Sequence, residues 1–229
     1  MHTSLAREFM SDDDLFRAAQ RGKVDTTLQL LQQLLQQNAP PSVFASALKV
    51  AIWNDHANIV REIARLVGHM RATHYWEFAA HHDSPEATRA LMQFKPSAPE
   101  HHSALQCAAF VGNAATMALL IPFVPSSSHR QRALFTAALI GHKRAVRTLI
   151  RARVDVNTGL VSRTALHGAA DCGHSQVVKQ LLWYKADIRA FTHDGKTALD
   201  LAIQRQYVAT AAVLRRFAAK VDSMRDFRK

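Results

Sequence analysis

Cysteine is scarce in this sequence: the 229 residues contain only Cys107 and Cys172. Two cysteines cannot form the disulfide framework of a small secreted protein. Their scarcity favours a reducing, intracellular environment, and we expect a cytoplasmic location. The N-terminal stretch "MHTSLAREFMSDDD" has no apolar run long enough for a secretory signal. The most apolar run, Met117 to Val124, is too short to span a bilayer as a helix.

Glycine and proline are also few, with 8 and 7 residues, and period-two runs of Val, Ile, Thr and aromatic residues are nearly absent. Glycine and proline interrupt helices, and period-two runs are typical of strands. Long stretches of helix-forming residues remain. Hydrophobic residues make up 48% of the chain, which is enough for a substantial core. We therefore predict an all-α protein.

Acidic residues are outnumbered: 18 Asp and Glu stand against 29 Lys and Arg, which gives a formal net charge of +11. Such a surplus favours an anionic partner, whether an acidic protein surface, a nucleic acid or a membrane surface. Net charge says nothing about the fold.

The sequence holds no phosphate-binding glycine loop, no nucleophile elbow and no paired catalytic carboxylates. Its densest group of reactive residue types is "TALHGAADCGH", residues 164–174, with His167, Asp171, Cys172 and His174. These residue types can ligate a metal ion or form a thiol enzyme. They can equally be part of a structural motif.

The same stretch belongs to an internal repeat. "TALDLAI" begins at Thr197, in phase with "TALHGAA" at Thr164, and "ALFTAALIGHKRAV" aligns with "ALHGAADCGHSQVV". More degenerate copies continue to the N-terminus and give seven units of about 28 to 33 residues. The clearer units place Leu and an Ala pair at i, i+3 and i+4, on one face of a helix. This pattern predicts stacked helical hairpins.

The order Thr, small residue, Leu, His, Ala pair, Gly-His and "ADI" or "VDVN" resembles the ankyrin repeat family, most closely at residues 133–217. Ala165 stands where the family usually has proline. The resemblance implies an all-α solenoid with β-turn-like finger loops. We expect one repeat domain at residues 13–217, between a tail at 1–12 and a basic tail at 218–229. The expected units are residues 13–40, 41–70, 71–98, 99–127, 128–159, 160–192 and 193–217.

In that family the signature threonine and histidine hydrogen-bond locally, and the Gly-His pair closes the turn between the two helices. The resemblance gives such structural roles to Thr164, His167, Gly173, His174, Thr197, Gly141, Gly112 and Gly22. Cys172 falls where the two preceding units have Ile140 and Val111, so a catalytic thiol is not expected there. We therefore expect a scaffold that is not an enzyme and has no metal and no cofactor.

Two histidine pairs, at residues 81–82 and 101–102, raise the metal question again. Adjacent residues on a helix point about 100° apart, so one pair cannot chelate an ion well. Glu77 lies one turn before His81, but two ligands are too few for a zinc site. We favour solvated or partner-facing histidines over an enzyme built on the polar cluster at residues 76–83.

The resemblance places binding in a concave groove lined by the first helices and on the finger tips. The groove positions directly after each Ala pair are apolar in the central units: the candidates are Trp53, His81, His82, Phe110, Val111, Leu139, Ile140 and Asp171. The finger candidates are the cations Arg130, Arg132, Arg163, Arg189 and Lys196. An exposed apolar strip marks an interaction site. Alternatively, a long loop or an N-terminal unit covers the strip, and the sequence leaves both readings open.

We expect a monomeric, non-catalytic protein–protein interaction module that binds a protein with an acidic surface. The implied roles are adaptor, inhibitor or host-directed effector, the last delivered into a host cell. The alternative is a nucleic-acid or other polyanion partner, motivated by the +11 charge. Against that alternative, the basic residues are scattered and the groove centre is apolar rather than basic.

Overall fold

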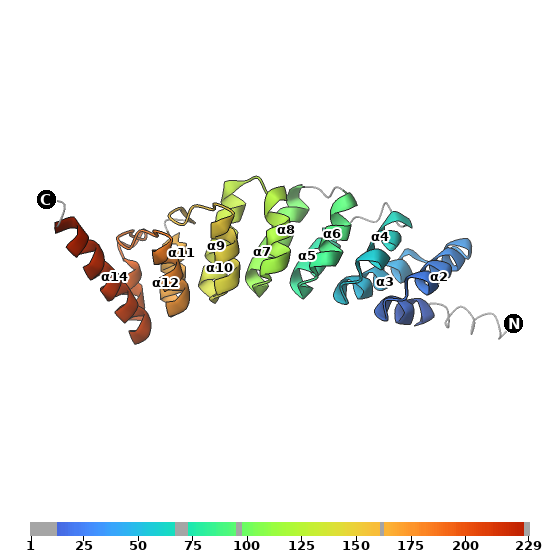
Figure 1. Ribbon diagram of the computed structural model, residues 1–229, viewed down its shortest axis with the longest axis horizontal. Coiled ribbons are helices and arrows are strands. Elements are labelled where there is room, and N and C mark those ends of the chain that lie inside the picture. The colour runs from blue at the N-terminus through green and yellow to red at the C-terminus, as the bar shows by residue number, and fades with distance from the viewer. Residues whose placement is uncertain (1–12, 67–72, 95–97, 161–162, 227–229) are drawn as a thin grey trace. The chain divides into compact units, whose positions relative to one another are not determined.

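The computed structural model of the chain describes residues 13–66, 73–94, 98–160 and 163–226, and Figure 1 shows its helices. The expected N-terminal tail, residues 1–12, lies outside the described residues. The contacts divide the chain into two compact units, Met1–Ala104 and Leu105–Lys229. The division falls inside one helix, α7 (Ala98–Val111).

Unit 1 consists of helical pairs. The elements before α7 are a helix at residues 13–20, α2 (Val24–Gln36), α3 (Pro41–Trp53), α4 (Ala57–Leu66), α5 (Thr73–His82), α6 (Pro85–Leu91) and the 3₁₀ turn η1 (Met92–Phe94). Proline begins both α3 and α6, at the first helical position, where its missing N–H would have no partner within the helix.

Unit 2 continues the pattern along the chain. After α7 come α8 (Ala114–Leu120), the 3₁₀ turn η2 (Ile121–Phe123), α9 (Ser127–Ile140), α10 (Lys143–Arg151), α11 (Ala165–Asp171), α12 (Ser175–Trp183), α13 (Ala198–Gln204) and α14 (Val208–Asp226). The described helices fall into seven consecutive pairs, which confirms the predicted all-α repeat. The segment expected as a basic C-terminal tail is helical up to Asp226, because α14 continues through it.

The predicted Leu and Ala positions form the core. Leu105, Ala108 and Ala109 of α7 are fully buried, and Leu134 and Ala137 of α9 are buried to the same degree. Because alanine side chains are small, they allow neighbouring first helices such as α9 and α11 to pack closely. Within unit 2, each pair therefore buries its apolar face against the next pair in line.

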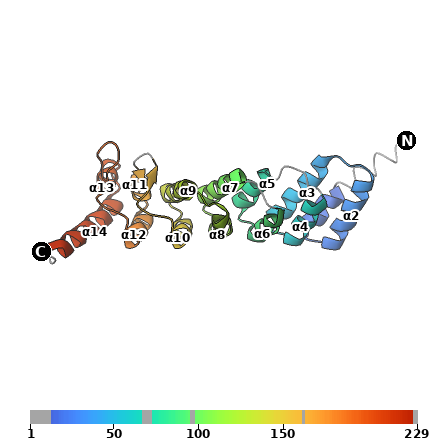
Figure 2. The same cartoon turned by 90° about the horizontal axis from the view of Figure 1, so that it is seen from above.

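The helices of unit 2 form two layers, which Figure 2 shows from above. The first helices α9, α11 and α13 contact one another in order, and the second helices α10, α12 and α14 do the same. The two layers are joined because α9 packs on α10, α11 on α12 and α13 on α14. Each layer has an outer face of its own.

A left-handed backbone follows the first helix in most pairs. The residues at this place are Gly22, Asp55, Asp83, Gly112, Gly141 and Gly173, with φ between +51° and +96°. Glycine adopts this conformation without steric cost, and aspartate is among the few other residues that tolerate it.

Finger loops connect successive pairs in unit 2. β1 (Gly159–Leu160) and β2 (Arg163–Thr164) form a two-stranded antiparallel ladder in which Gly159 pairs with Thr164. A Cβ atom at Gly159 would lie 2.6 Å from the carbonyl oxygen of Arg163, so this close pairing requires glycine. In the next finger, the N–H of Thr192 donates to the carbonyl oxygen of Lys196 at 2.9 Å.

Candidate functional site

The signature threonine and histidine form a local cap that also holds the next finger. The N–H of Thr164 donates to Nδ1 of His167 at 3.2 Å, and Nε2 of His167 donates to the carbonyl oxygen of Ala190 at 3.0 Å. Nδ1 therefore accepts and Nε2 carries the proton, which makes the ring neutral. His167 is fully buried, and this burial lowers its pKa.

Two turn histidines of unit 2 connect neighbouring pairs instead of closing only their own turns. Nε2 of His174 donates to the carbonyl oxygen of Leu139 at 3.0 Å, and Nε2 of His142 donates to that of Phe110 at 2.9 Å. The expectation that the Gly-His pair closes a turn is thus too local. These bonds fix the backbone at two candidate groove residues, Phe110 and Leu139.

Unit 1 contains the same link and one variation of it. Nε2 of His56 donates to the carbonyl oxygen of Gln20 at 3.1 Å. In the third pair, Ser84 stands at the histidine position, and the Asp55 carboxylate accepts from the N–H of Ala87 at 2.7 Å. Burial raises the pKa of Asp55. The same structural task is therefore done by different side chains in different pairs.

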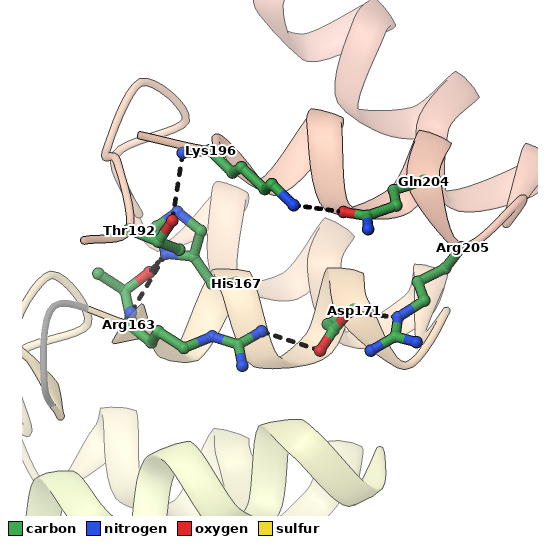
Figure 3. Close-up of polar contacts among 8 residues, drawn as sticks. Arg163, His167, Asp171, Thr192, Lys196, Gln204 and Arg205 are labelled. Atoms are coloured by element: carbon green, nitrogen blue, oxygen red, sulfur yellow. Dashed lines mark hydrogen bonds and ion pairs between the residues drawn. The ribbon is translucent and has the colours of Figure 1, made fainter. Parts of the chain in front are cut away.

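Asp171, a candidate groove residue, lies between two arginines. Its Oδ2 is 2.8 Å from Nη2 of Arg163, and its Oδ1 is 2.8 Å from Nε of Arg205 (Figure 3). Burial would raise the pKa of the Asp171 carboxyl, but the hydrogen bonds from Arg205 and Arg163 outweigh burial and leave the pKa below its ordinary value. Only 13% of the side chain is exposed. The arrangement joins the sixth pair to the seventh.

The reactive-looking stretch lacks the features of a catalytic or metal site. Burial and the neighbouring Asp171 carboxylate raise the pKa of the Cys172 thiol, which disfavours the nucleophilic thiolate. Cys107 and Cys172 form no disulfide, and both are half-buried. Among the described residues, no three His, Cys, Asp or Glu side chains are arranged to hold a metal ion. No helix in the described ranges of the chain is long and apolar enough to cross a membrane.

The histidine pair of α5 is part of an aromatic cluster in unit 1. The ring of Trp53 stacks on His82 with centroids 5.2 Å apart, and the ring of Phe78 lies 4.4 Å from His82. His81 meets His82 edge-on at 5.1 Å. Burial, followed by the charge of His81, lowers the pKa of His82. A neutral His82 therefore contributes aromatic surface beside Trp53.

The groove candidates are divided between the units: Trp53, His81 and His82 lie in unit 1, and Phe110, Val111, Leu139, Ile140 and Asp171 in unit 2. Trp53 and Phe110 each expose 65% of their surface. Val111, Leu139 and Ile140, at the ends of α7 and α9, are half-buried. The apolar candidate surface in unit 2 is therefore centred on Phe110.

The finger candidates differ in their exposure to solvent and in their hydrogen-bond partners. Arg163 is held by Asp171, Nζ of Lys196 donates to Oε1 of Gln204 at 2.7 Å, and Nε of Arg130 donates to the carbonyl oxygen of Val124. Arg132 and Arg189 are exposed. The side chains of Arg163, Lys196 and Arg130 thus make hydrogen bonds within the repeat stack.

Sequence reasoning missed a cationic surface on the second helices of unit 2. Trp183, at the end of α12, exposes 77% of its surface there. A signal was present in the sequence, because neither α10 nor α12 contains an Asp or Glu. The sequence prediction considered the first helices, the fingers and the basic C-terminal segment, and did not include the exposed faces of α10 and α12.

Comparison with known proteins agrees with this architecture. Residues 134–224 match the family model for ankyrin repeats, in three copies. No curated protein is a significant match to the chain. The matched segment runs from α9 into α14 and contains the signature cap at Thr164 and His167. Ankyrin repeats are generally protein–protein interaction modules and are typically not catalytic. Residues 134–224 therefore belong to the ankyrin repeat family.

Proposed function

We propose that the chain is a protein-binding module whose first-helix layer holds a partner through exposed aromatic anchors. In unit 2 the anchor is Phe110, and this residue carries the proposal. Phe110 is 65% exposed, so packing in the core does not explain why this residue is aromatic. Large exposed aromatic residues are enriched among the residues that dominate binding energies.

The backbone around the anchor supports this role. The carbonyl of Phe110 is held by His142 at 2.9 Å, and Ala108 and Ala109, directly before it, are fully buried. The side chain thus projects from a fixed helix end. A fixed anchor loses little conformational entropy on binding, which favours affinity.

Unit 1 offers a comparable anchor. Trp53 also exposes 65% of its surface, and its ring rests on His82 at 5.2 Å. Each unit can therefore contribute an anchor of its own to a partner. The exposed finger cations Arg132 and Arg189 favour a partner with an acidic surface.

In this proposal the chain acts as an adaptor, an inhibitor or an effector, because each of these roles needs binding without chemistry. The two cysteines, which form no disulfide, favour a reducing, intracellular site of action. The raised pKa of the Cys172 thiol is consistent with a non-catalytic role.

Site-specific crosslinking tests the proposal. A photo-reactive benzoylphenylalanine is placed at Phe110 and, as a control, at Phe123, which is 45% exposed on η2. Irradiation in cell extract is expected to link a protein at position 110 and not at 123. Unlabelled wild-type chain should compete for this partner about ten-fold better than the Phe110→Ala variant. Equal crosslinking at both positions would contradict the proposal.

A nucleic-acid partner is the competing reading, favoured by the net charge of +11. It predicts that nuclease treatment of the extract removes the crosslinked species. It also predicts that the affinity for an oligonucleotide falls steeply as salt concentration rises. Nuclease-resistant crosslinks at Phe110 would leave the protein partner as the better explanation.

A further inference from the structure

The second helices of unit 2 carry a cationic surface that the proposed function does not use. Its basic residues are Lys143, Arg147, Arg151, Lys179, Arg216 and Lys220, and its most exposed aromatic residue is Trp183. We call these seven residues the outer cationic surface. They come from α10, α12 and α14, which contact one another in that order. The surface therefore lies on a single layer of helices (Figure 2).

The charge of this surface is of one sign. Helices α10 and α12 contain no Asp or Glu, and α14 has its two aspartates only near its end, at Asp222 and Asp226. Charges on the exposed face of a stacked helix are commonly of mixed sign, because opposite charges three or four residues apart stabilise a helix. In α10 the exposed charges only repel one another, and α12 adds a single charge, that of Lys179. A surface of this kind is suited to an anionic ligand.

Two hollows follow the helices across this surface. One, of about 560 Å³, lies between α12 and α14 and is lined by Trp183, Val213 and Phe217 with Lys179 and Arg216 beside them. The other, of about 350 Å³, lies between α10 and α12 and is mainly basic. Trp183 and Lys179 line both hollows. The first hollow can take apolar groups and the second can take anions.

Trp183 is the most exposed aromatic side chain among those described, at 77%. Its neighbour in sequence, Leu182, is half-buried, and Leu181 is fully buried. The helix is thus anchored by the leucines, and the tryptophan adds little to packing. An exposed tryptophan with cations around it has the composition of a binding hot spot.

We propose that the outer cationic surface binds an acidic amphipathic helix of a partner protein. Apolar side chains of that helix enter the hollow between α12 and α14, next to Trp183 and Phe217. Carboxylates on its flanks pair with Lys179 and Arg147 on the α12 side and with Arg216 on the α14 side. This is recognition of an amphipathic helix in a groove, with charge complementarity setting its orientation.

Three other occupants fit the surface less well. A second copy of the chain would oppose like charges, because the chain carries a net charge of +11. An anionic bilayer presents a flat face that does not fill a recess between two helices. A single-stranded nucleic acid needs successive aromatic platforms, whereas Trp183 and Tyr184 are adjacent residues at the end of α12 that point about 100° apart, and Phe217 lies in the recess.

The proposal goes beyond the binding proposed for Phe110, because the two surfaces lie on different helix layers. Binding at one does not require binding at the other. Variants at Phe110 and at Trp183 therefore test the two proposals separately. Both side chains are exposed, so their replacement by alanine should leave the fold intact.

A synthetic peptide tests this proposal. The probe is a fluorescein-labelled helix of about five turns, with Leu or Phe at i, i+3, i+4 and i+7 and Glu elsewhere. A scrambled peptide of the same composition is the comparison. Wild-type chain is expected to bind the amphipathic peptide, and Trp183→Ala should weaken that binding about ten-fold or more, as measured by fluorescence anisotropy. The Phe110→Ala variant should bind as the wild type does.

A charge-matched pair of variants separates specific pairing from general attraction. Lys179→Gln with Arg216→Gln removes two cations from the surface, and Lys49→Gln with Arg21→Gln removes two exposed cations from unit 1. The first pair should weaken peptide binding at least about three-fold more than the second. Equal effects would overturn the proposal, and so would equal binding of the scrambled peptide or the absence of any binding.

Three further outcomes would also overturn it. The first is tighter binding of an oligothymidylate than of the peptide. The second is binding to phosphatidylserine vesicles that is lost in Trp183→Ala. The third is a dimer in solution that is lost in the same variant. Loss of peptide binding in Phe110→Ala but not in Trp183→Ala would place the peptide on the first-helix layer and reject only the outer cationic surface.

Discussion

The imidazole of His174 lies against Gly141 and donates from Nε2 to the carbonyl oxygen of Leu139, 3.0 Å away in the preceding helical pair. A Cβ atom on Gly141 would lie only 2.6 Å from Nδ1 of the same ring. Glycine is therefore required there for two reasons. Its φ of +96° is left-handed, and the next pair's histidine occupies the space of a side chain.

Gly141→Ala is expected to destabilise unit 2 by about 1.5 to 3.5 kcal/mol. The left-handed conformation costs about 1 to 2 kcal/mol for a residue with a Cβ atom, and displacement of His174 loses a hydrogen bond worth about 0.5 to 1.5 kcal/mol. Urea unfolding followed by circular dichroism measures the change. His174→Ala with Gly141→Ala should lose less than the sum of the two single variants, because both disrupt one contact.

Gly195→Ala is the matched control for this prediction. Gly195 also has a positive φ, of +69°, but no atom lies within 4 Å of the place that a Cβ would take. Only the conformational cost of about 1 to 2 kcal/mol remains. Equal losses at Gly141 and Gly195 would show that the contact with His174 adds nothing to stability.

The stability of the sixth pair should depend on pH through His167. Burial lowers the pKa of His167 in the folded chain below its value of about 6.5 in the unfolded chain. The unfolded state therefore binds a proton first. The contribution of a neutral His167 is fully present above about pH 6.5 and is lost as pH falls from there toward the folded pKa, with a limiting slope of about 1.4 kcal/mol per pH unit.

His167→Gln is the variant that isolates this contribution. Glutamine can accept from the N–H of Thr164 as in an ordinary capping box, but it does not titrate. Between pH 7.5 and pH 5.5, the free energy of unfolding should fall less in the variant than in the wild type. Parallel curves would mean that another group causes the acid sensitivity.

Asp171→Asn should destabilise unit 2 by about 1 kcal/mol at pH 7, a modest value because Arg205 is 59% exposed and Arg163 is 34% exposed. The amide has one acceptor oxygen for two guanidinium donors. The pKa of Asp171 lies below its ordinary value, so its contribution is present above about pH 3.9 and is lost as pH falls through the folded pKa. The difference between variant and wild type should therefore shrink toward pH 2.

Asp194→Asn is the control, because it makes the same change of charge at an exposed position. The carboxylate of Asp194 contacts the exposed side chain of His193. The effect of this substitution should stay within about 0.5 kcal/mol. If the two variants lose the same stability at pH 7, net charge rather than the two arginine contacts explains the effect of Asp171→Asn.

The helical pairs could be predicted because their signals are local and periodic. Leu134 and Ala137 are three residues apart, so they lie on one face of any helix that contains them. A glycine directly after a helix, such as Gly141, favours a left-handed turn. Each copy of this pattern alone is weak evidence for a helical pair, and its recurrence along the chain makes the prediction stronger. The cap at Thr164 and His167 was likewise local.

The surface could be predicted only in part because it depends on neighbours that lie a full repeat away. Nothing in the sequence indicates that Asp171 meets Arg205, and this contact removes a residue that otherwise resembles a groove position. Similarly, Arg147 and Lys179 are distant in the sequence but line one hollow once α10 packs on α12. Basic residues that are scattered along the chain thus gather on one face.

Leu105 and Phe110 are on the same helix, α7, and should respond in opposite ways to replacement by alanine. Leu105 is fully buried, so Leu105→Ala removes packed methyl groups and should lower the free energy of unfolding by about 2 to 5 kcal/mol. Phe110 is 65% exposed, so Phe110→Ala should change it by less than about 0.5 kcal/mol while weakening partner binding about ten-fold. Urea unfolding and competition for the crosslinked partner measure the two effects. A stability loss in Phe110→Ala close to that in Leu105→Ala would make Phe110 a core residue and remove the main support for binding on the first-helix layer.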